Sequence, residues 1–169
     1  QTDVIYDGVD VQKVEPMTDK QYYVRGCTAL LDAVGGAIHH IGNVHKYALD
    51  EDRPGKTTCI ITSDGRENAS RIYSYDKVKK MVERQKSKYG WEFLFLGANI
   101  DAVEVDGRFG IDKNRAINYE SDSRGTALNF AVMTKTVSAV RRAATKAEIN
   151  ECIDACCDDI RQDYAKRHK

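Results

Sequence analysis

The sequence has no excess of charge of either sign, since 26 Lys and Arg residues balance 26 Asp and Glu residues among 169. Proteins that bind nucleic acid or acidic membrane surfaces usually concentrate positive charge, so we expect neither partner here. Long apolar runs are also lacking, and no stretch approaches the roughly 18 residues that a membrane-spanning helix needs. The content of 41% apolar and 31% charged residues is typical of a globular protein.

The five cysteines form no CxxC pair, and their number is odd. This usage favours reduced thiols and a cytoplasmic protein. Three of them, Cys152, Cys156 and Cys157, lie in the last predicted helix, where Cys152 and Cys156 share a face with isoleucines 149, 153 and 160. Because free cysteine behaves as a small hydrophobe, we expect core packing here rather than metal binding.

Motifs of several enzyme classes are lacking as well. The chain has no GxxxxGK[ST] phosphate loop, no dinucleotide fingerprint, no GxSxG and no HExxH. We therefore expect His39, His40 and His45 to be exposed helix residues rather than zinc ligands. No nucleophile stands beside a base either, so the sequence predicts a binding protein rather than an enzyme.

What the sequence does contain is an alternation of short apolar strands with amphipathic helices. Strands are predicted at 3–14, 57–62, 91–98 and 115–119, and helices at 28–41, 75–89, 101–106, 125–143 and 145–166. This order predicts an α/β fold with three αβα layers around a mostly parallel, Rossmann-like sheet. We expect a single domain over 1–169, with a core at about 3–143 and an amphipathic C-terminal helix at 145–168.

Local signals predict several helix ends. Thr28 and Ser123 are expected N-caps, Gly90 is expected to follow a helix end, and Thr145 to Glu148 reads as a capping box. Gly35-Gly36 lies inside the helix at 28–41, where each glycine costs roughly 1 kcal/mol against alanine. Close packing against a neighbouring element would explain such small residues.

Two oxygen-bearing side chains are predicted to meet at the carboxyl edge of the sheet. Asp64 follows the strand at 57–62, and Thr28 begins the helix at 28–41. Ligands of open parallel sheets bind at this edge, and carboxylate and hydroxyl oxygens suit Mg²⁺ or Mn²⁺. Asp32, one turn after Thr28, would orient a ligand group. The alternative is a plain Asp-Gly turn and an ordinary helix cap.

The sequence contains, in this order, the stretches RGCTALLDAVG, IITSDGRENAS, WEFLFLGANIDA, FGI and AINYESDSRGT. Together they resemble the von Willebrand factor A-type (VWA) domain, in particular its bacterial intracellular branch. The resemblance covers about residues 3–143. It implies a metal-ion-dependent adhesion site that holds Mg²⁺ with three loops, where Thr28 and Asp64 match two of the ligands. It also implies a partner protein that presents a carboxylate. The rim would comprise Ser63, Gly65, Glu67, Asn68 and Arg71.

The first ligand loop of that family, Asp-x-Ser-x-Ser, is missing, because no Asp has Ser at both plus two and plus four. The match begins at the family's third strand, so the sequence predicts an N-terminally truncated VWA-like domain. Three explanations stay open: a fragment of a longer protein, a second chain that supplies the missing strands, or residues 3–14 in the gap. If residues 3–14 fill the gap, or if the chain is a lone fragment, Thr28 and Asp64 alone would hold Mg²⁺ weakly.

The sequence therefore predicts a metal-dependent, protein-binding domain with an incomplete Mg²⁺ site. The alternative function is a Mg²⁺-dependent phosphoryl-transfer or hydrolase enzyme with Asp64 as nucleophile or metal ligand. Such an enzyme would need a second carboxylate in the same loop and a lysine that grips phosphate. Glu67 and Arg66 do not reproduce that pattern.

Overall fold

The computed structural model describes residues 3–18, 20–21, 26–98 and 107–168. Within them, three parallel strands form one sheet in the order β1-β2-β3, with β1 at Thr58–Ser63, β2 at Glu92–Gly97 and β3 at Ala116–Asn118. Ile61 of β1 lies opposite Phe95 of β2, and Leu96 of β2 lies opposite Ile117 of β3. The predicted strands at 57–62, 91–98 and 115–119 are confirmed within one or two residues.

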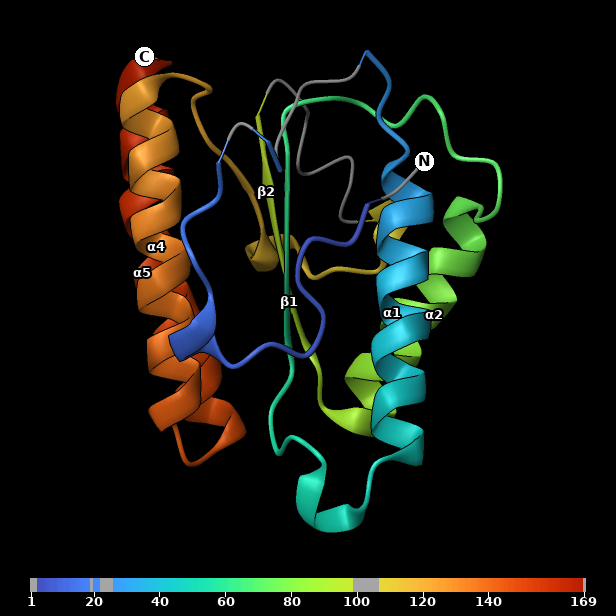
Figure 1. Ribbon diagram of the computed structural model, residues 1–169. Coiled ribbons are helices and arrows are strands. Elements are labelled where there is room, and N and C mark those ends of the chain that lie inside the picture. The colour runs from blue at the N-terminus through green and yellow to red at the C-terminus, as the bar shows by residue number, and fades with distance from the viewer. Residues whose placement is uncertain (1–2, 19, 22–25, 99–106, 169) are drawn as a thin grey trace.

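Helices cover both faces of this sheet (Figure 1). Helices α1 (Leu30–Tyr47) and α2 (Tyr75–Tyr89) pack on one face, and α4 (Ser123–Arg142) and α5 (Lys146–Arg167) pack on the other. The α/β class with helical layers on either side of a parallel sheet is therefore confirmed. In the part of the chain that the structure describes, no helix is both long and apolar enough to span a bilayer.

The two faces of β2 explain why its sequence is apolar from Phe93 onward, whereas Glu92 at its start is buried and paired with Lys146. Phe93 and Phe95 belong to the core under α1 and α2, whereas Leu94 and Leu96 belong to the core under α4 and α5. Successive side chains of a strand point to opposite faces, so a strand covered on both sides needs apolar residues at every position. All six residues of β2 are buried.

The helix ends follow local chemistry in most places. Gly90 takes a left-handed conformation (φ 66°) after α2, and the Trp91 N–H donates to the Gln85 carbonyl at 3.1 Å. The capping box at the start of α5 is present in full, with Thr145 and Glu148 each bonded to the other's backbone N–H. Asp122, rather than the predicted Ser123, caps α4 by accepting from the Gly125 N–H at 2.6 Å.

The predicted strand at 3–14 is wrong. This segment contains a 3-10 turn at Val11–Lys13, and the Asp10 carboxylate accepts a hydrogen bond from the Gln12 N–H at 3.0 Å. Such a local bond competes with a sheet ladder. Val9 and Val11 stay 43% and 67% exposed, so their alternation with polar residues does not lead to burial against a sheet face.

Two predicted helices differ from the structure or lie outside the described residues. Helix α1 begins at Leu30, with Ala29 as N-cap instead of Thr28, and it runs to Tyr47 rather than ending at residue 41. Thr28 therefore lies one residue outside the cap position. The predicted short helix at 101–106 lies outside the described residues.

One edge of β1 is unpaired in the described part of the chain. The Thr57 and Ser63 carbonyls accept from the Glu92 and Ala98 N–H groups of β2 at 2.9 and 2.8 Å. In a parallel ladder, alternate residues bond to the same neighbour, so odd-numbered residues of β1 face β2. The backbone groups of Thr58, Ile60 and Thr62 point to the opposite edge, where no described strand lies. Only Ile61 of β1 is buried, in contrast to the whole of β2.

Candidate functional site at the carboxyl edge of the sheet

The loop after β1 and the start of α1 meet at the carboxyl edge of the sheet. A Cβ placed on Gly65 would lie 2.8 Å from Thr28 Oγ1, so the hydroxyl rests against the backbone of residue 65. Only glycine permits this approach without displacing the hydroxyl. The predicted neighbourhood of Thr28 and the Asp64-Gly65 loop is therefore confirmed.

Asn68 joins the two segments by a reciprocal pair of hydrogen bonds. The Thr28 N–H donates to Asn68 Oδ1 at 2.8 Å, and the Asn68 N–H donates to the Thr28 carbonyl at 3.0 Å. This pairing holds Thr28 outside the cap position of α1. Asn68 thus connects the two loops, and it is exposed at this edge; its place in the rim stays a prediction.

Glu67 caps α1 from the other loop. Its carboxylate accepts from the Leu31 N–H at 2.8 Å, and from the Ala69 and Ser70 N–H groups at 3.0 and 2.7 Å. The Ser70 hydroxyl donates to Glu67 at 2.8 Å and accepts from the Asp32 N–H at 2.9 Å. The first turn of α1 therefore gains its acceptors from a loop 36 residues or more away, which is why Ala29 serves without a side-chain cap.

The charge state of Glu67 follows from these donors. Burial is the largest single influence and opposes ionisation, but the Leu31, Ser70 and Ala69 donors together hold the pKa of Glu67 below its ordinary value of 4.5. A group with a lowered folded-state pKa stabilises the fold above its unfolded value. That contribution is lost as the pH falls through the folded-state pKa.

We accordingly expect acid to weaken the unmodified protein more than the Glu67→Gln variant. The free energy of unfolding of the variant should change less between about pH 6 and about pH 3, because its amide does not titrate. Urea unfolding at both pH values measures this difference. Glu51→Gln, which alters an exposed carboxylate of the 3-10 turn at Asp50–Asp52, is the control and should follow the unmodified protein. A Glu67→Gln profile parallel to that of the unmodified protein would contradict the assignment.

Asp32 holds the loop as well. Its Oδ2 accepts from the Arg71 N–H, and its Oδ1 accepts from the Ile72 and Tyr73 N–H groups, each at 2.9 Å. The Arg71 N–H contributes most to a lowered pKa of Asp32, against an opposing effect of burial, and the other two donors add to it. Asp32 and the Arg71 backbone are therefore engaged with each other. The sequence pattern did not predict this role.

Two oxygen-bearing groups at this edge are left open. Asp64 is exposed, and neither its carboxylate nor Thr28 Oγ1 accepts a hydrogen bond from the described residues. Ser63 instead closes the turn, since its hydroxyl donates to the Gly65 carbonyl at 2.9 Å. The Thr28 hydroxyl thus lies against Gly65, next in sequence to the exposed Asp64, while Glu67 and Asp32 bond to backbone groups.

The oxygens of these two groups are of the type that binds Mg²⁺ or Mn²⁺, but they are too few to complete the coordination of either ion. Both are hard oxygen donors, whereas Mg²⁺ requires six oxygens near 2.1 Å and gives up water reluctantly. Across the described ranges, no cluster of three or more His, Cys, Asp or Glu side chains is placed to hold a metal. The described residues therefore provide only part of a magnesium site.

The histidines of α1 and the cysteines of α5 lie outside the loops that hold Thr28 and Asp64. His39 and His40 are exposed as predicted, but His45 is half-buried with its ring 5.4 Å from that of Trp91, so its prediction is wrong. Cys157 is the fully buried cysteine of α5, whereas Cys152 and Cys156 are half-buried. Burial raises the pKa of Cys157 to about 11, which keeps it a thiol. The cytoplasmic location stays a prediction.

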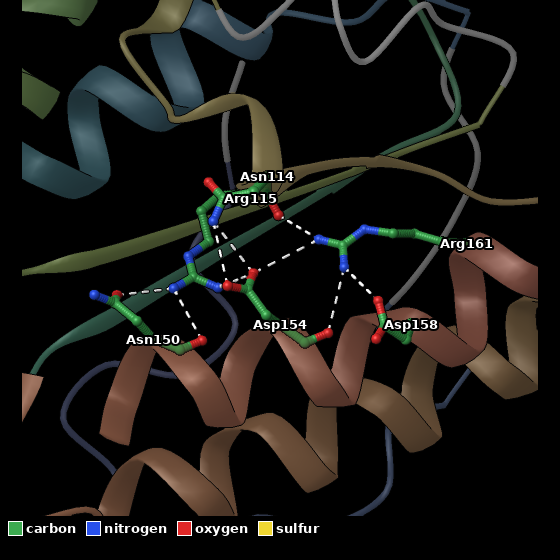
Figure 2. Close-up of polar contacts among 6 residues, drawn as sticks. All are labelled: Asn114, Arg115, Asn150, Asp154, Asp158 and Arg161. Atoms are coloured by element: carbon green, nitrogen blue, oxygen red, sulfur yellow. Dashed lines mark hydrogen bonds and ion pairs between the residues drawn. The ribbon is translucent and has the colours of Figure 1, made fainter. Parts of the chain in front are cut away.

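The sequence pattern also missed a polar network at the opposite end of the sheet (Figure 2). Arg115, only 4% exposed, precedes β3 and donates to Asp154 Oδ1 at 3.0 Å and to Asn150 Oδ1 at 2.9 Å. Arg161 donates to the Asn114 carbonyl at 2.6 Å and to Asp158 at 2.7 Å. The network ties α5 to the turn before β3. Asn150, Asp154 and Asp158 recur every four residues, a spacing that places them on one helix face.

A comparison of the chain with protein-family models, with curated proteins and with solved structures found no match in any of the three.

Proposed function

We propose that the chain is a protein-binding domain of the VWA type that depends on Mg²⁺ or Mn²⁺. Thr28 and Asp64 would hold the metal, which would accept a carboxylate from a partner protein. The observation that carries the proposal is the approach of the Thr28 hydroxyl to Gly65, next to the exposed Asp64, at the carboxyl edge. Asp32, Glu67 and Asn68 support it, because they fix the two loops with backbone hydrogen bonds.

We further propose that a strand from another chain, or from another part of the protein, pairs with β1 and completes the site. The unpaired backbone groups of Thr58, Ile60 and Thr62 support this step, since exposed sheet edges pair readily with further strands. Asn129 of α4 supports it too. Its amide donates to Thr62 Oγ1 at 3.3 Å, but its buried Oδ1 has no partner among the described residues. A strand parallel to β1 would end at the same edge as Asp64.

The enzymatic alternative has less support. A phosphoryl-transfer site built around Asp64 would use a second carboxylate of the same loop, and Glu67 is the candidate. Its two oxygens already accept four hydrogen bonds from Leu31, Ala69 and Ser70. The discriminating measurement is hydrolysis of a generic phosphate ester with Mg²⁺. Turnover that disappears in Asp64→Asn would favour the enzyme over the binding domain.

Calorimetry with Mg²⁺ and Mn²⁺ tests the metal claim. We expect weak binding by this chain, because the described residues offer only two protein ligands, and no detectable binding by Asp64→Ala. Asp52→Ala is the matched control, since Asp52 is an exposed aspartate before β1, at the other end of that strand. The control variant should bind as the unmodified chain does. Binding that survives Asp64→Ala, or no binding by the unmodified chain, would refute the metal claim.

A further inference from the structure

A pocket of about 700 Å³ lies at the amino end of the sheet, opposite the edge that carries Asp64. The C-terminal halves of α1 and α2, the segment before β1 and Trp91 form its walls. Its volume lies within the range of roughly 300–1,000 Å³ that is typical of small-molecule sites. None of its lining residues belongs to the loops that hold Thr28 and Asp64, so the pocket is separate from the proposed metal site.

The charge around this pocket has one sign. Lys46, Arg53, Arg84 and Lys88 line it, and no Asp or Glu occurs among the described residues of its lining. The chain as a whole has balanced charge, so this is a local concentration. Clefts lined by one sign of charge focus the field and attract ligands of the opposite sign.

Two of these cations, Arg53 and Lys46, contact other residues of the chain. Arg53 donates to the His45 carbonyl at 2.9 Å and pairs with Asp50 at 3.1 Å, and Lys46 lies over the Tyr47 ring at 4.9 Å. Arg84 and Lys88 instead both lie near Tyr89. Hydrogen bonding from Lys88, and then from Arg84, lowers the pKa of Tyr89. Neither Arg84 nor Lys88 pairs with a carboxylate of the described residues, so these two side chains form the cationic part of the pocket that can bind an anion beside the Tyr89 hydroxyl.

Stabilisation of helix ends explains only part of this arrangement. Helices α1 and α2 both end here, and cations in the last turn complement the helix dipole. That accounts for Lys46 and Lys88, which lie in those last turns. Arg84 precedes the last turn of α2, and Arg53 lies outside both helices. Helix capping gives no reason for their presence around the same pocket.

The rest of the lining combines aliphatic and aromatic residues with the uncharged polar side chains of Asn43, Thr57 and Gln85. Ile38 and Met81 contribute aliphatic surface, and His45, Tyr89 and Trp91 contribute rings. Rings offer flat surfaces against which a planar ligand group can stack. Lys88 lies over the Tyr89 ring, 5.2 Å from its centre, so a cation and a ring are adjacent in the lining.

From this combination we propose that the pocket binds a small organic anion in which a phosphate-like group is joined to a flat ring, the chemistry of a nucleoside monophosphate. Arg84 and Lys88 hold the charged group, and the aromatic wall receives the ring. This binding is independent of the proposed metal-dependent function, because it uses neither Thr28 nor Asp64. Its test contains no divalent metal, so the two proposals can fail separately.

The experiment is a titration of the unmodified chain with AMP, adenosine and inorganic phosphate in turn. Trp91 is the only tryptophan of the chain and lines the pocket, so its fluorescence reports on occupancy. We expect a saturable change with AMP, at concentrations at least roughly tenfold below those needed for adenosine or phosphate. No saturable change with AMP would overturn the proposal. If adenosine bound as tightly as AMP, the proposed role of Arg84 and Lys88 in holding the phosphate would be overturned. If inorganic phosphate bound as tightly as AMP, the proposed role of the aromatic wall in holding the ring would be overturned.

Variants locate the binding. Arg84→Gln combined with Lys88→Gln should weaken AMP binding by roughly tenfold for each cation removed. Lys80→Gln combined with Lys135→Gln removes the same charge from exposed positions outside the pocket and should leave AMP binding unchanged. Equal weakening in both double variants would show a general effect of charge and would overturn the assignment. Circular dichroism confirms that each variant is folded.

Discussion

Alanine at Gly35 is expected to destabilise the protein, whereas alanine at the adjacent Gly36 is expected to stabilise it. A Cβ on residue 35 would lie 2.5 Å from Cγ and Cδ1 of the Tyr73 ring, and the ring is held on a loop that Asp32 fixes. Overpacking of this kind costs about 1–3 kcal/mol. At residue 36 no atom lies within 4 Å of the same position, so only the helix-forming gain of up to about 1 kcal/mol applies.

Urea unfolding of the two variants measures this opposite effect. Because the residues are adjacent in α1 and the substitution is the same, each variant is the control for the other. The Gly35→Ala change should also disturb the segment at 71–73, since the Tyr73 N–H donates to Asp32. Changes of the same sign at both positions would refute the proposed contact between Tyr73 and Gly35.

Asp154→Ala is expected to lower the free energy of unfolding by about 3 kcal/mol. Removal of one partner from a buried ion pair costs about 3–5 kcal/mol, because the other charge is left uncompensated. Arg115 has a side chain that is only 5% exposed, while that of Asp154 is 43% exposed. The bond from Arg115 to Asn150 also survives. We therefore expect the lower end of that range.

Asp158→Ala is the matched control one turn further along α5. Among the residues that the structure describes, Asp158 pairs only with Arg161, at 2.7 Å, and its side chain is 57% exposed. Exposed pairs of this kind contribute about 0–1 kcal/mol. Denaturant unfolding of the two variants should therefore differ by about 2 kcal/mol or more. Equal losses would mean that burial of Arg115 does not govern the energetics of the network.

The sequence predicted well those features that depend on neighbouring residues. The apolar run of β2, the glycine after α2 and the capping box of α5 are local patterns, and the structure confirms all three. Gly35 was predicted to pack closely against a neighbour, and it does so against Tyr73. Gly36 has no such neighbour, because it lies on a different side of α1.

Features that depend on distant residues were predicted poorly. Glu67 was predicted as part of a rim and Asp32 as a residue that orients a ligand group, and both stay predictions; their bonds to backbone groups 36 to 41 residues away were not predicted. The helix pattern at 145–166 likewise gave no sign that Asp154 pairs with Arg115. The spacing of residues along the sequence does not indicate which loop will contact which helix in the fold. The strand predicted at 3–14 was wrong for a related reason, since alternation shows which residues could be buried but not whether a partner strand exists.

The cap that Glu67 provides makes the start of α1 and the loop after β1 a single cooperative unit. Hydrogen bonds from Leu31 and Asp32 lead into that loop, and those from Arg71 to Tyr73 lead back to α1. Local opening of a protein proceeds by such units rather than by single bonds. The juxtaposition of Thr28 and Asp64 therefore lasts only as long as the first turn of α1 stays closed, and a ligand that holds them together slows the opening of that turn.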